Sequence, residues 1–484
     1  MKKRLTQVAA IALAGCMLAG CAGSGNKTKE TLNPADYETD KKFITIVDST
    51  PNVESEAEMK LYTDAGFNTF ILTEDYVPMT ENGKLSDSYK KAIEKLGDMG
   101  LNVWIRNMWN DGDYFDLDKA KSGSNYGSPY TMQPRKITSE FDAFPEVTGF
   151  YMADELYKET LKDNPDTEAD ESLYCSMDKM DKLIEWKNKY YPDKFWHINH
   201  VPSSSYDHWE DGDYASFIQH YVDTILRKLK SGGRSISMDH YPLTQSDAVD
   251  TNYLSDILTL GNIARDYNAS VSEDQKAEFC ICLQTFQNQS ELSLELYHTR
   301  DIESVQDITF QMYTGMACGT TMFEYFCWRS YDSLGMYGIV DETGEKRIYD
   351  YVKGANELAL PFEKVVLAFD WQGLTVKKGE LSGKDDVFGE VDGMTIEDTG
   401  VLQSIDSRYD AIVGCFKKDG QDGYMAVNFT NPALKRTNAV TMNFKGCTQA
   451  LVYTEEGTEQ VNLTKDGDLR LILKEGQAAF VIPK

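Results

Sequence analysis

The stretch Val147-Thr148-Gly149-Phe150-Tyr151-Met152-Ala153-Asp154-Glu155-Leu156 decides how the chain is organised. Its first part is short, rich in aromatic and β-branched residues and preceded by Pro145, which is typical of a buried strand. The strand stops in two adjacent acids, Asp154 and Glu155. In α/β folds, ligands bind at the carboxyl ends of the parallel strands. The two acids therefore either belong to such a site or cap the helix that follows.

Similar apolar runs recur along the chain, and each is followed by a stretch with helical spacing. Eight of these β-then-α units can be counted, with strand-like runs at 43–48, 67–72, 101–105, 147–153, 195–199, 235–239, 279–284 and 320–326. Strands that alternate with helices predict a parallel sheet, and eight units predict a (β/α)8 TIM barrel of the α/β class. A doubly wound open sheet is the alternative, but no glycine-rich phosphate loop follows the first strand.

The pattern changes near Asp370, where helical spacing stops. Short alternating runs with turns between them follow to the end of the chain, and they predict an all-β sandwich. The predicted organisation has four parts: a signal peptide (1–21), a flexible tether (22–40), a barrel domain (41–368) and a β-sandwich domain (369–484).

The N-terminal segment is predicted to be a targeting signal. Lys2, Lys3 and Arg4 precede an apolar stretch of small residues that is too short for a comfortable membrane span. It ends in Leu18-Ala19-Gly20-Cys21, which resembles the bacterial lipobox. The resemblance implies cleavage before Cys21, lipidation of that cysteine and a position in the bacterial cell envelope, on the exported side of the membrane. An earlier copy ending at Cys16 leaves a shorter apolar stretch, so Cys21 is preferred.

Charge and cysteine content narrow the possible partners. The 484 residues carry a formal net charge of −29, which argues against nucleic acid as a partner. No cysteine after Cys21 falls in a C-x-x-C pair, so neither a disulfide framework nor a zinc pattern is visible. His200 and His240 are interpreted as hydrogen-bonding groups rather than ligands, so no metal and no cofactor is predicted.

Polar, acidic and aromatic residues follow nearly every predicted strand. In a barrel these ends open on one face, where the connecting loops build the site. In the sixth run, Ser235, Ser237 and Asp239 alternate with Ile236 and Met238, so Asp239 is expected to point into the barrel mouth. The predicted catalytic residues are Glu155, Asp239 and Glu324. The predicted substrate-binding residues are Arg106, Trp109, Asp154, Asn199, Tyr241, Gln284 and Trp328.

Acids flanked by aromatic residues are suited to cleavage of glycosidic bonds. That reaction needs one carboxylic acid to protonate the leaving oxygen and one carboxylate to act as nucleophile or to activate water. A carboxyl group at an apolar strand end has a raised pKa, which suits a general acid. The sequence therefore predicts a glycoside hydrolase with a carbohydrate substrate, anchored to the membrane by lipid.

Several motifs, in order, resemble those of (β/α)8 glycoside hydrolases related to clan A and to the family 42 β-galactosidase-like lipoproteins. They are Gly149-Phe150-Tyr151-Met152-Ala153-Asp154-Glu155, Ile198-Asn199-His200-Val201-Pro202, Ser237-Met238-Asp239-His240-Tyr241-Pro242 and Glu324-Tyr325-Phe326-Cys327-Trp328. The segments 338–344, 427–432 and 466–480 also look like parts of these proteins, the last two of their appended β-sandwich. The resemblance covers about 43–484.

The resemblance implies that Glu155, which ends the fourth strand, is the acid/base residue. In clan A the nucleophile is a glutamate that ends the seventh strand, but here Gln284 stands there. Asp239 and Glu324 are the candidates for the second carboxylate, and alternation favours Asp239. Glu324 can also be a buried structural acid paired with Arg106 or Arg329. Trp328 is either a platform for a sugar ring or a core residue.

Two other functions remain open. Gln284 in place of an acid also fits a barrel that only binds glycans at the cell surface. A non-glycosidic barrel enzyme, such as a metal-dependent hydrolase, is the third possibility, but the first strand ends in Asp48-Ser49-Thr50 rather than in a histidine pair.

Overall fold

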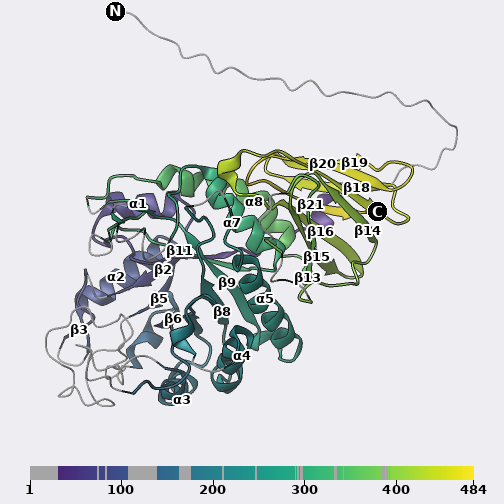
Figure 1. Ribbon diagram of the computed structural model, residues 1–484. Coiled ribbons are helices and arrows are strands. Elements are labelled where there is room, and N and C mark those ends of the chain that lie inside the picture. Colours follow the sequence, from purple (N-terminus) through teal and green to yellow (C-terminus); the bar gives the residue numbers. More distant parts are fainter. Residues whose placement is uncertain are drawn as a thin grey trace, which may run out of the picture. The chain divides into compact units, whose positions relative to one another are not determined.

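The structure is a computed structural model. It describes residues 31–73, 76–81, 84–106, 139–162, 176–209, 212–245, 248–288, 290–291, 294, 298–331, 335–341, 343–382, 387–388, 391 and 393–484. Two of the predicted site residues, Trp109 and Cys21, lie outside these ranges. Figure 1 shows the described chain as parallel strands with helices, followed by antiparallel strands in green and yellow.

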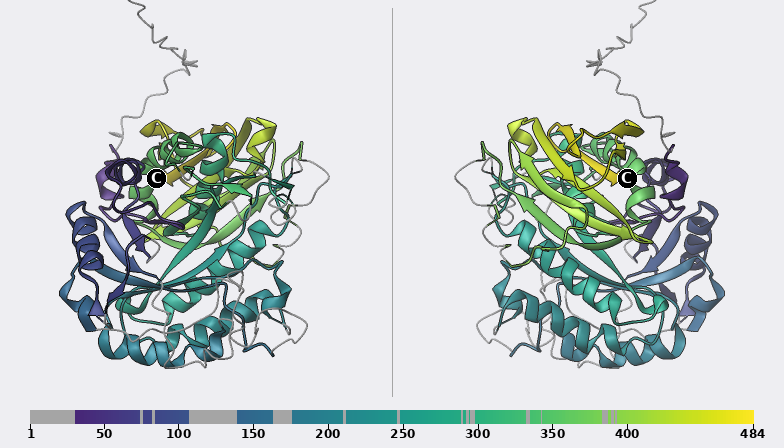
Figure 2. Two further views of the ribbon diagram at one scale, coloured as in Figure 1. Left: turned by 90° about the vertical axis from the view of Figure 1, so that its left-hand side faces the viewer. Right: turned by 90° about the vertical axis from the view of Figure 1, so that its right-hand side faces the viewer.

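Eight parallel strands form the first sheet. Their spatial order is β1-β11-β9-β8-β7-β6-β5-β2. They span Ile44–Val47 (β1), Thr69–Leu72 (β2), Asn102–Ile105 (β5), Val147–Asp154 (β6), Phe195–Asn199 (β7), Arg234–Asp239 (β8), Ala277–Gln284 (β9) and Met322–Phe326 (β11). Helices lie around the outside of these strands (Figure 1, Figure 2). The predicted TIM barrel is therefore confirmed.

Side chains rather than a backbone ladder bridge the gap between β1 and β2. The Asn68 amide accepts from the backbone N–H of Thr45 (3.1 Å) and donates to the carbonyl of Phe43 (2.7 Å). Thr50 Oγ1 donates to the carbonyl of Ile71 (2.9 Å). These bonds satisfy backbone groups that the edges of an open sheet leave unpaired.

Short polar side chains cap the first turn of some of the helices that follow the strands. Ser86 and Asp213 accept from the backbone N–H groups of Tyr89 (3.1 Å) and Ser216 (2.7 Å), which stabilises the first turns of α2 and α4. The helices span Glu56–Asp64 (α1), Asp87–Asp98 (α2), Asp181–Tyr190 (α3), Tyr214–Thr224 (α4), Tyr253–Ala269 (α5), Val305–Ala317 (α7) and Tyr349–Val366 (α8). None of the helices within the described ranges is both long enough and apolar enough to cross a bilayer.

One helix is shorter than its hydrophobic spacing predicts. The spacing predicts a helix over 213–230, but α4 ends at Thr224 and a 3-10 turn follows at Leu226–Lys228. Arg234, fully buried at the start of β8, donates to the carbonyls of Leu226 (2.9 Å) and Leu229 (3.2 Å). These carbonyls are thus satisfied by a side chain, which favours the tight turn.

Apolar side chains fill the interior of the barrel below its mouth. Six buried residues from six different strands form one cluster there: Ile46, Ile71, Trp104, Tyr151, Cys280 and Met322. The Trp104 ring stacks on Phe195 with 4.6 Å between ring centroids. Gly149 on β6 lies directly against this pair. A methyl group at Gly149 would lie 2.7 Å from Trp104 Nε1 and 2.7 Å from Phe195 Cβ.

Replacing Gly149 with alanine is therefore expected to lower the free energy of unfolding by about 1–3 kcal/mol, because the stacked pair must shift inside a close-packed interior. Urea denaturation followed by circular dichroism measures the change. Thr148→Ala, on the adjacent half-buried position, is the control and should cost less. An equal loss of unfolding free energy in both variants would show that Trp104 and Phe195 make room for the added methyl group without strain.

The second part of the fold consists of two antiparallel sheets. The larger has the order β13-β15-β16-β21-β18-β19, and the smaller has the order β14-β17-β20. Their strands span Asp370–Lys377 (β13), Leu402–Ser407 (β14), Ala411–Lys418 (β15), Gln421–Asn428 (β16), Asn438–Phe444 (β17), Gln449–Thr454 (β18), Gly457–Asn462 (β19), Asp468–Leu473 (β20) and Ala478–Pro483 (β21). Buried side chains from both sheets, such as Val413, Met442 and Leu471, share one core. The predicted β-sandwich is confirmed, and we call it the β domain.

Candidate active site

The mouth of the barrel holds an arginine between two carboxylates from other strands. Arg106 follows β5, and its guanidinium donates to Asp48 after β1 and to Asp154 Oδ2 at the end of β6 (3.0 Å). The three side chains are 17%, 12% and 19% exposed. Although burial alone favours the neutral form, the two carboxylates raise the pKa of Arg106. Arg106 therefore stays charged and offsets part of the negative charge of the mouth.

Two further side chains hold Asp154. Asn199 on β7 donates to its Oδ1 atom (3.2 Å), and the Tyr151 hydroxyl donates to the same oxygen (3.3 Å). Ser237 on β8 in turn donates to the Asn199 amide oxygen (3.4 Å). Burial raises the pKa of Asp154 to about 6, the guanidinium of Arg106 opposes this rise, and the nearby carboxylate of Asp48 adds to it. Asn199 thus positions a carboxylate, as its place at a strand end suggests.

Glu155 and Asp239 form a carboxyl pair at the mouth. Their side chains share a hydrogen bond, although they come from the ends of two different strands, β6 and β8. Burial raises the pKa of Asp239 well above its usual value, and the neighbouring acids Glu155 and Asp154 raise it further. Two carboxyl groups in direct contact cannot both be ionised without strong repulsion, so the pair holds one proton between them. The raised pKa means that Asp239 gives up a proton less readily than a free carboxyl group does.

The backbone at Glu155 has a conformation that is rare for a non-glycine residue. Its φ angle is +50°, and its backbone N–H donates to the carbonyl of Asn199 (2.8 Å). Left-handed residues of this kind cost roughly 1–3 kcal/mol and gather at functional sites. The turn directs Glu155 towards Asp239 rather than along the line of β6. No helix begins within residues 155–162, so Glu155 caps no helix there.

Glu324, on β11, is a further buried acid near this pair. It is 1% exposed and shares hydrogen bonds with Tyr151 and with His197 Nε2 (3.1 Å). The other ring nitrogen of His197 contacts the Ser235 hydroxyl (2.7 Å). Burial raises the pKa of Glu324 to about 8, with Asp48 adding to the rise and Arg106 opposing it. Burial lowers the pKa of His197 to about 3, so both groups are neutral at neutral pH.

Tyr151 links the buried Glu324 to Asp154 at the mouth, because its hydroxyl contacts both acids. A phenol has one proton, so the Tyr151 hydroxyl donates either to Glu324 or to Asp154 at any one time. Neither arginine that the sequence suggested pairs with Glu324 in a salt bridge. Arg106 holds Asp48 and Asp154, and Arg329 pairs with Glu58 (2.5 Å).

The raised pKa of Glu324 makes stability depend on pH. Its folded-state pKa of about 8 lies above its ordinary value of 4.5, so the folded protein binds a proton there that the unfolded chain releases. Stability from this group is fully present below pH 4.5 and is lost as pH rises to 8. Glu324→Gln mimics the neutral acid. We expect its melting temperature to fall less than that of the wild type between pH 5 and pH 8, measured by scanning calorimetry.

The exposed Glu159→Gln serves as the control for this prediction. It should follow the wild-type pH dependence throughout. A Glu324→Gln variant that loses stability between pH 5 and pH 8 as steeply as the wild type would show that Glu324 is ionised in the folded protein.

A stack of aromatic rings borders the acids. Phe326, at the end of β11, stacks on Tyr241 (centroids 5.9 Å apart) and on Tyr331 (5.8 Å), and all three are partly exposed. Phe286 meets the edges of Tyr241 and Phe326 at 5.2 and 5.9 Å. The Tyr331 hydroxyl also donates to Asp48 Oδ2 (3.5 Å). We call Tyr241, Phe286, Phe326 and Tyr331 the aromatic wall. Phe286 is completely buried and supports the other rings from behind, so only Tyr241, Phe326 and Tyr331 offer faces. Such faces suit the apolar side of a sugar ring.

Two of the predicted substrate-binding residues do not reach this site. Gln284 is completely buried, and its amide donates to the carbonyl of Arg300 (2.7 Å). Trp328 is also completely buried, against Tyr62 of α1 and Tyr349 of α8. Trp328 follows the last residue of β11, so the alternation along that strand no longer fixes its direction. Of the two interpretations of Trp328, the structure favours the core residue.

Two histidines near strand ends also lie apart from the acids. The His200 ring is completely buried and packs on Tyr221 with 4.3 Å between centroids. His240 contacts Asp256 (2.8 Å) and Asp250 (3.5 Å). Each histidine is held by its own surroundings rather than by the carboxyl pair.

Sequence reasoning did not assign roles to His197 and Tyr331. His197 and Asn199 are two residues apart on β7 and therefore share one face of the strand. Because Asn199 was expected at the mouth, the same alternation could have predicted that His197 points into the barrel. Tyr331 lies beyond β11, where no periodicity marks it.

Comparisons with known proteins give a likeness in fold only. No protein-family model matches the chain, and no curated protein matches it. Solved structures that are similar include a β-galactosidase from the psychrophilic Marinomonas ef1 (10% identity, TM-score 0.43), a protein described as a glycoside hydrolase (13%, 0.45) and an arabinofuranosidase (10%, 0.42). The alignments cover 66%, 91% and 92% of this chain and 60%, 92% and 98% of those chains, respectively. These neighbours are glycoside hydrolases, but at such low similarity they say nothing about catalysis here.

Proposed function

We propose that this protein is a lipid-anchored glycoside hydrolase that acts on carbohydrate at the mouth of the barrel, with Glu155 and Asp239 as its carboxyl pair. The carrying observation is the hydrogen bond between these two side chains. It supplies one proton and one carboxylate at the same place, which are the two groups that glycosidic cleavage requires. The aromatic wall, whose Tyr331 contacts Asp48 at the same mouth, supplies faces for sugar rings.

The two carboxyl groups have different roles in this proposal. Glu155 protonates the leaving oxygen, and Asp239 is the second carboxylate. The proton that the pair shares reaches Glu155 along the hydrogen bond that already joins the two groups. A sugar does not fit between carboxyl groups in contact, since retaining enzymes keep theirs ~5 Å apart and inverting enzymes ~6.5–9.5 Å apart. Entry of the substrate therefore separates the pair.

The test is release of chromophore from a panel of neutral aryl glycosides, with product release from polysaccharides measured in parallel by a reducing-sugar assay. The purified protein should hydrolyse one or a few members. The anomer first released, read by NMR, then shows whether the reaction retains or inverts. No hydrolysis of either the aryl glycosides or the polysaccharides would contradict the proposal.

A surface glycan-binding protein is the second candidate. Gln284, buried at the end of the seventh barrel strand, favours it, because the resembled enzymes carry their nucleophile there. Binding on a glycan array without hydrolysis of the bound glycan would support this candidate.

The lipid anchor rests on Leu18-Ala19-Gly20-Cys21. Expression of the full chain in bacteria fed an alkyne-tagged fatty acid should label the protein and place it in the membrane fraction. Cys21→Ala should lose the label, whereas Cys16→Ala should keep it. A label lost only in Cys16→Ala would move the cleavage site to the earlier motif.

A further inference from the structure

A short segment after the seventh barrel strand ties the loops of two strands together. We call residues 298–302 the strap. Its Arg300 N–H donates to the carbonyl of Leu243 (2.8 Å), beyond β8, and its Arg300 carbonyl accepts from the Gln284 amide (2.7 Å), at the end of β9. The backbone N–H of Asn288 donates to Asp301 Oδ1 (2.7 Å). The strap therefore holds the segments that follow β8 and β9 against each other.

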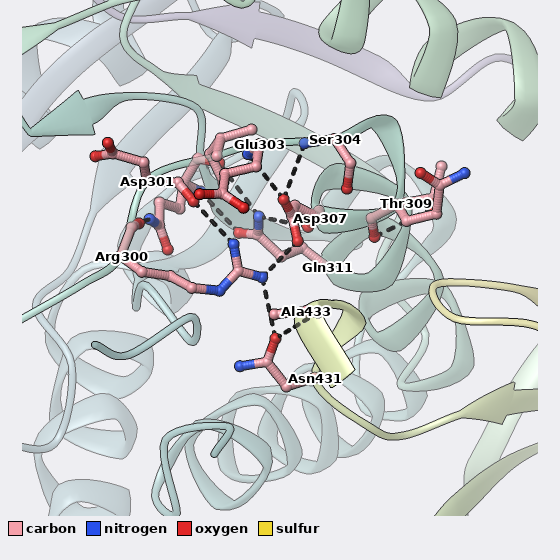
Figure 3. Close-up of polar contacts among 12 residues, drawn as sticks. Arg300, Asp301, Glu303, Ser304, Asp307, Thr309, Gln311, Asn431 and Ala433 are labelled. Atoms are coloured by element: carbon pink, nitrogen blue, oxygen red, sulfur yellow. Dashed lines mark hydrogen bonds and ion pairs between the residues drawn. The ribbon is translucent and has the colours of Figure 1, made fainter. Parts of the chain in front are cut away.

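The side chain of Arg300 anchors the strap (Figure 3). Its guanidinium donates to Asp307 in the first turn of α7, to the carbonyl of Asp301 (2.8 Å) and to Asn431 Oδ1 (3.0 Å). Asp307 is 2% exposed and accepts from the backbone N–H groups of Glu303 (2.9 Å) and Ser304 (3.0 Å). Asp307 is thus fixed, so it is a rigid partner for Arg300.

The third partner, Asn431, belongs to the β domain. It is 2% exposed, and Figure 3 shows it reaching Arg300 from the turn that carries Ala433. Its amide nitrogen donates to the carbonyl of Ala248 (3.2 Å), in the segment after β8, and its oxygen also accepts from the Ala433 N–H (3.0 Å). One side chain of the β domain therefore binds both the strap and the β8 loop.

The two loops that are tied in this way carry half of the aromatic wall. Tyr241 lies two residues before Leu243, and Phe286 lies two residues after Gln284, and the two rings are in contact at 5.2 Å. A shift of either loop moves a ring of the wall relative to the acids, which lie at the strand ends.

We propose that Asn431 is a positioning residue of the active site: through Arg300 and Ala248 it sets the place of Tyr241 and Phe286. The β domain is then part of the substrate-binding wall rather than a separate module. This inference rests on the proposed function. It predicts an effect on substrate binding and little effect on the chemical step, because Glu155 and Asp239 do not touch the tied loops through any of these bonds.

Three variants of the full chain test the inference. Asn431→Ala removes both links, and Asn431→Asp keeps an acceptor for Arg300. Thr309→Val is the matched control, because the hydroxyl of Thr309 on the same helix α7 donates to the β-domain carbonyl of Gly476 (2.8 Å) without touching the strap. For Asn431→Ala we expect KM to rise about 5- to 10-fold with kcat within about 2-fold. The KM of Asn431→Asp should lie close to the wild-type value, and Thr309→Val should keep the wild-type KM.

Hydrogen exchange read by mass spectrometry gives a readout that does not depend on activity. Peptides over 243–250 and 284–302 should exchange faster in Asn431→Ala and at the wild-type rate in Thr309→Val. Unchanged exchange of these peptides, or faster exchange with an unchanged KM, would overturn the inference while leaving the proposed function intact. If Asn431→Ala does not fold, KM and hydrogen exchange of Asn431→Asp and Arg300→Lys are compared with those of the wild type and Thr309→Val instead.

Failure of the proposed function has a different signature. If the wild type hydrolyses nothing but binds a glycan, the dissociation constant of that glycan takes the place of KM. Each variant should then change the dissociation constant by the factor given above for KM. A wild type that neither hydrolyses nor binds any glycan would overturn both the proposed function and the role of Asn431 in substrate binding.

Discussion

Replacing Glu155 with glutamine is expected to lower kcat/KM about 10²- to 10⁴-fold for a glycoside with a poor leaving group. A positioned general acid contributes a factor of this size, and the amide cannot give up a proton. The loss should be much smaller for a dinitrophenyl glycoside, because that leaving group departs without protonation. Asp239→Asn should lower the rates of both substrates by similar factors, since the second carboxylate is needed whatever the leaving group.

The comparison of the two leaving groups decides the roles within the pair. The opposite pattern, with Asp239→Asn sparing the dinitrophenyl substrate, would make Asp239 the proton donor. Full activity of Glu155→Gln on both substrates would exclude Glu155 from the chemistry. The exposed Glu159→Gln, four residues further along the chain, controls for the loss of a carboxylate near the mouth and should behave as the wild type.

Replacing Arg106 with leucine is expected to lower the free energy of unfolding at pH 7 by about 3–5 kcal/mol. The change leaves the carboxylates of Asp48 and Asp154 mostly buried without their shared cation. Arg106→Lys keeps the charge but cannot reach two carboxylates with a planar fork, so it should fall between the wild type and Arg106→Leu. Urea denaturation at pH 7 measures the free energies.

The control for Arg106 is Arg227→Ala, which removes an exposed ion pair with Asp223 on the surface. The two side chains are 44% and 54% exposed, so the expected loss is at most about 1 kcal/mol. Equal losses for Arg106→Leu and Arg227→Ala would mean that water enters the mouth and solvates Asp48 and Asp154. If Arg106→Leu does not fold, Arg106→Lys alone can still be compared with Arg227→Ala.

The barrel was predictable because each of its units repeats the same local signals. The apolar run ending in Asp154 and the alternation of Ser235, Ser237 and Asp239 predict which residues lie at the mouth. Met238 confirms the alternation, since its sulfur contacts the hydroxyl of Tyr214 on α4, on the helix side of β8. Local periodicity is thus enough to place a side chain on one face of one strand.

Local periodicity does not predict which side chains from different strands contact each other across the barrel. The hydrogen bond between Glu155 and Asp239 depends on the left-handed backbone at Glu155, which no feature of the sequence marks. Glu324 was predicted as a candidate acid, but its burial beside His197 depends on how deep each strand sits in the barrel. The role of Asn431 depends on a contact between residues 131 positions apart in the chain.

The buried acids also change how many protons the folded protein carries. The formal net charge of −29 counts every carboxyl group as ionised. The Glu155–Asp239 pair holds one shared proton, and Glu324 keeps its own at neutral pH, because burial raises the pKa of Asp239 and of Glu324. The unfolded chain releases these protons to water. Unfolding therefore acidifies an unbuffered solution, and the measured heat of unfolding at pH 7 includes the heat with which the buffer takes up those protons.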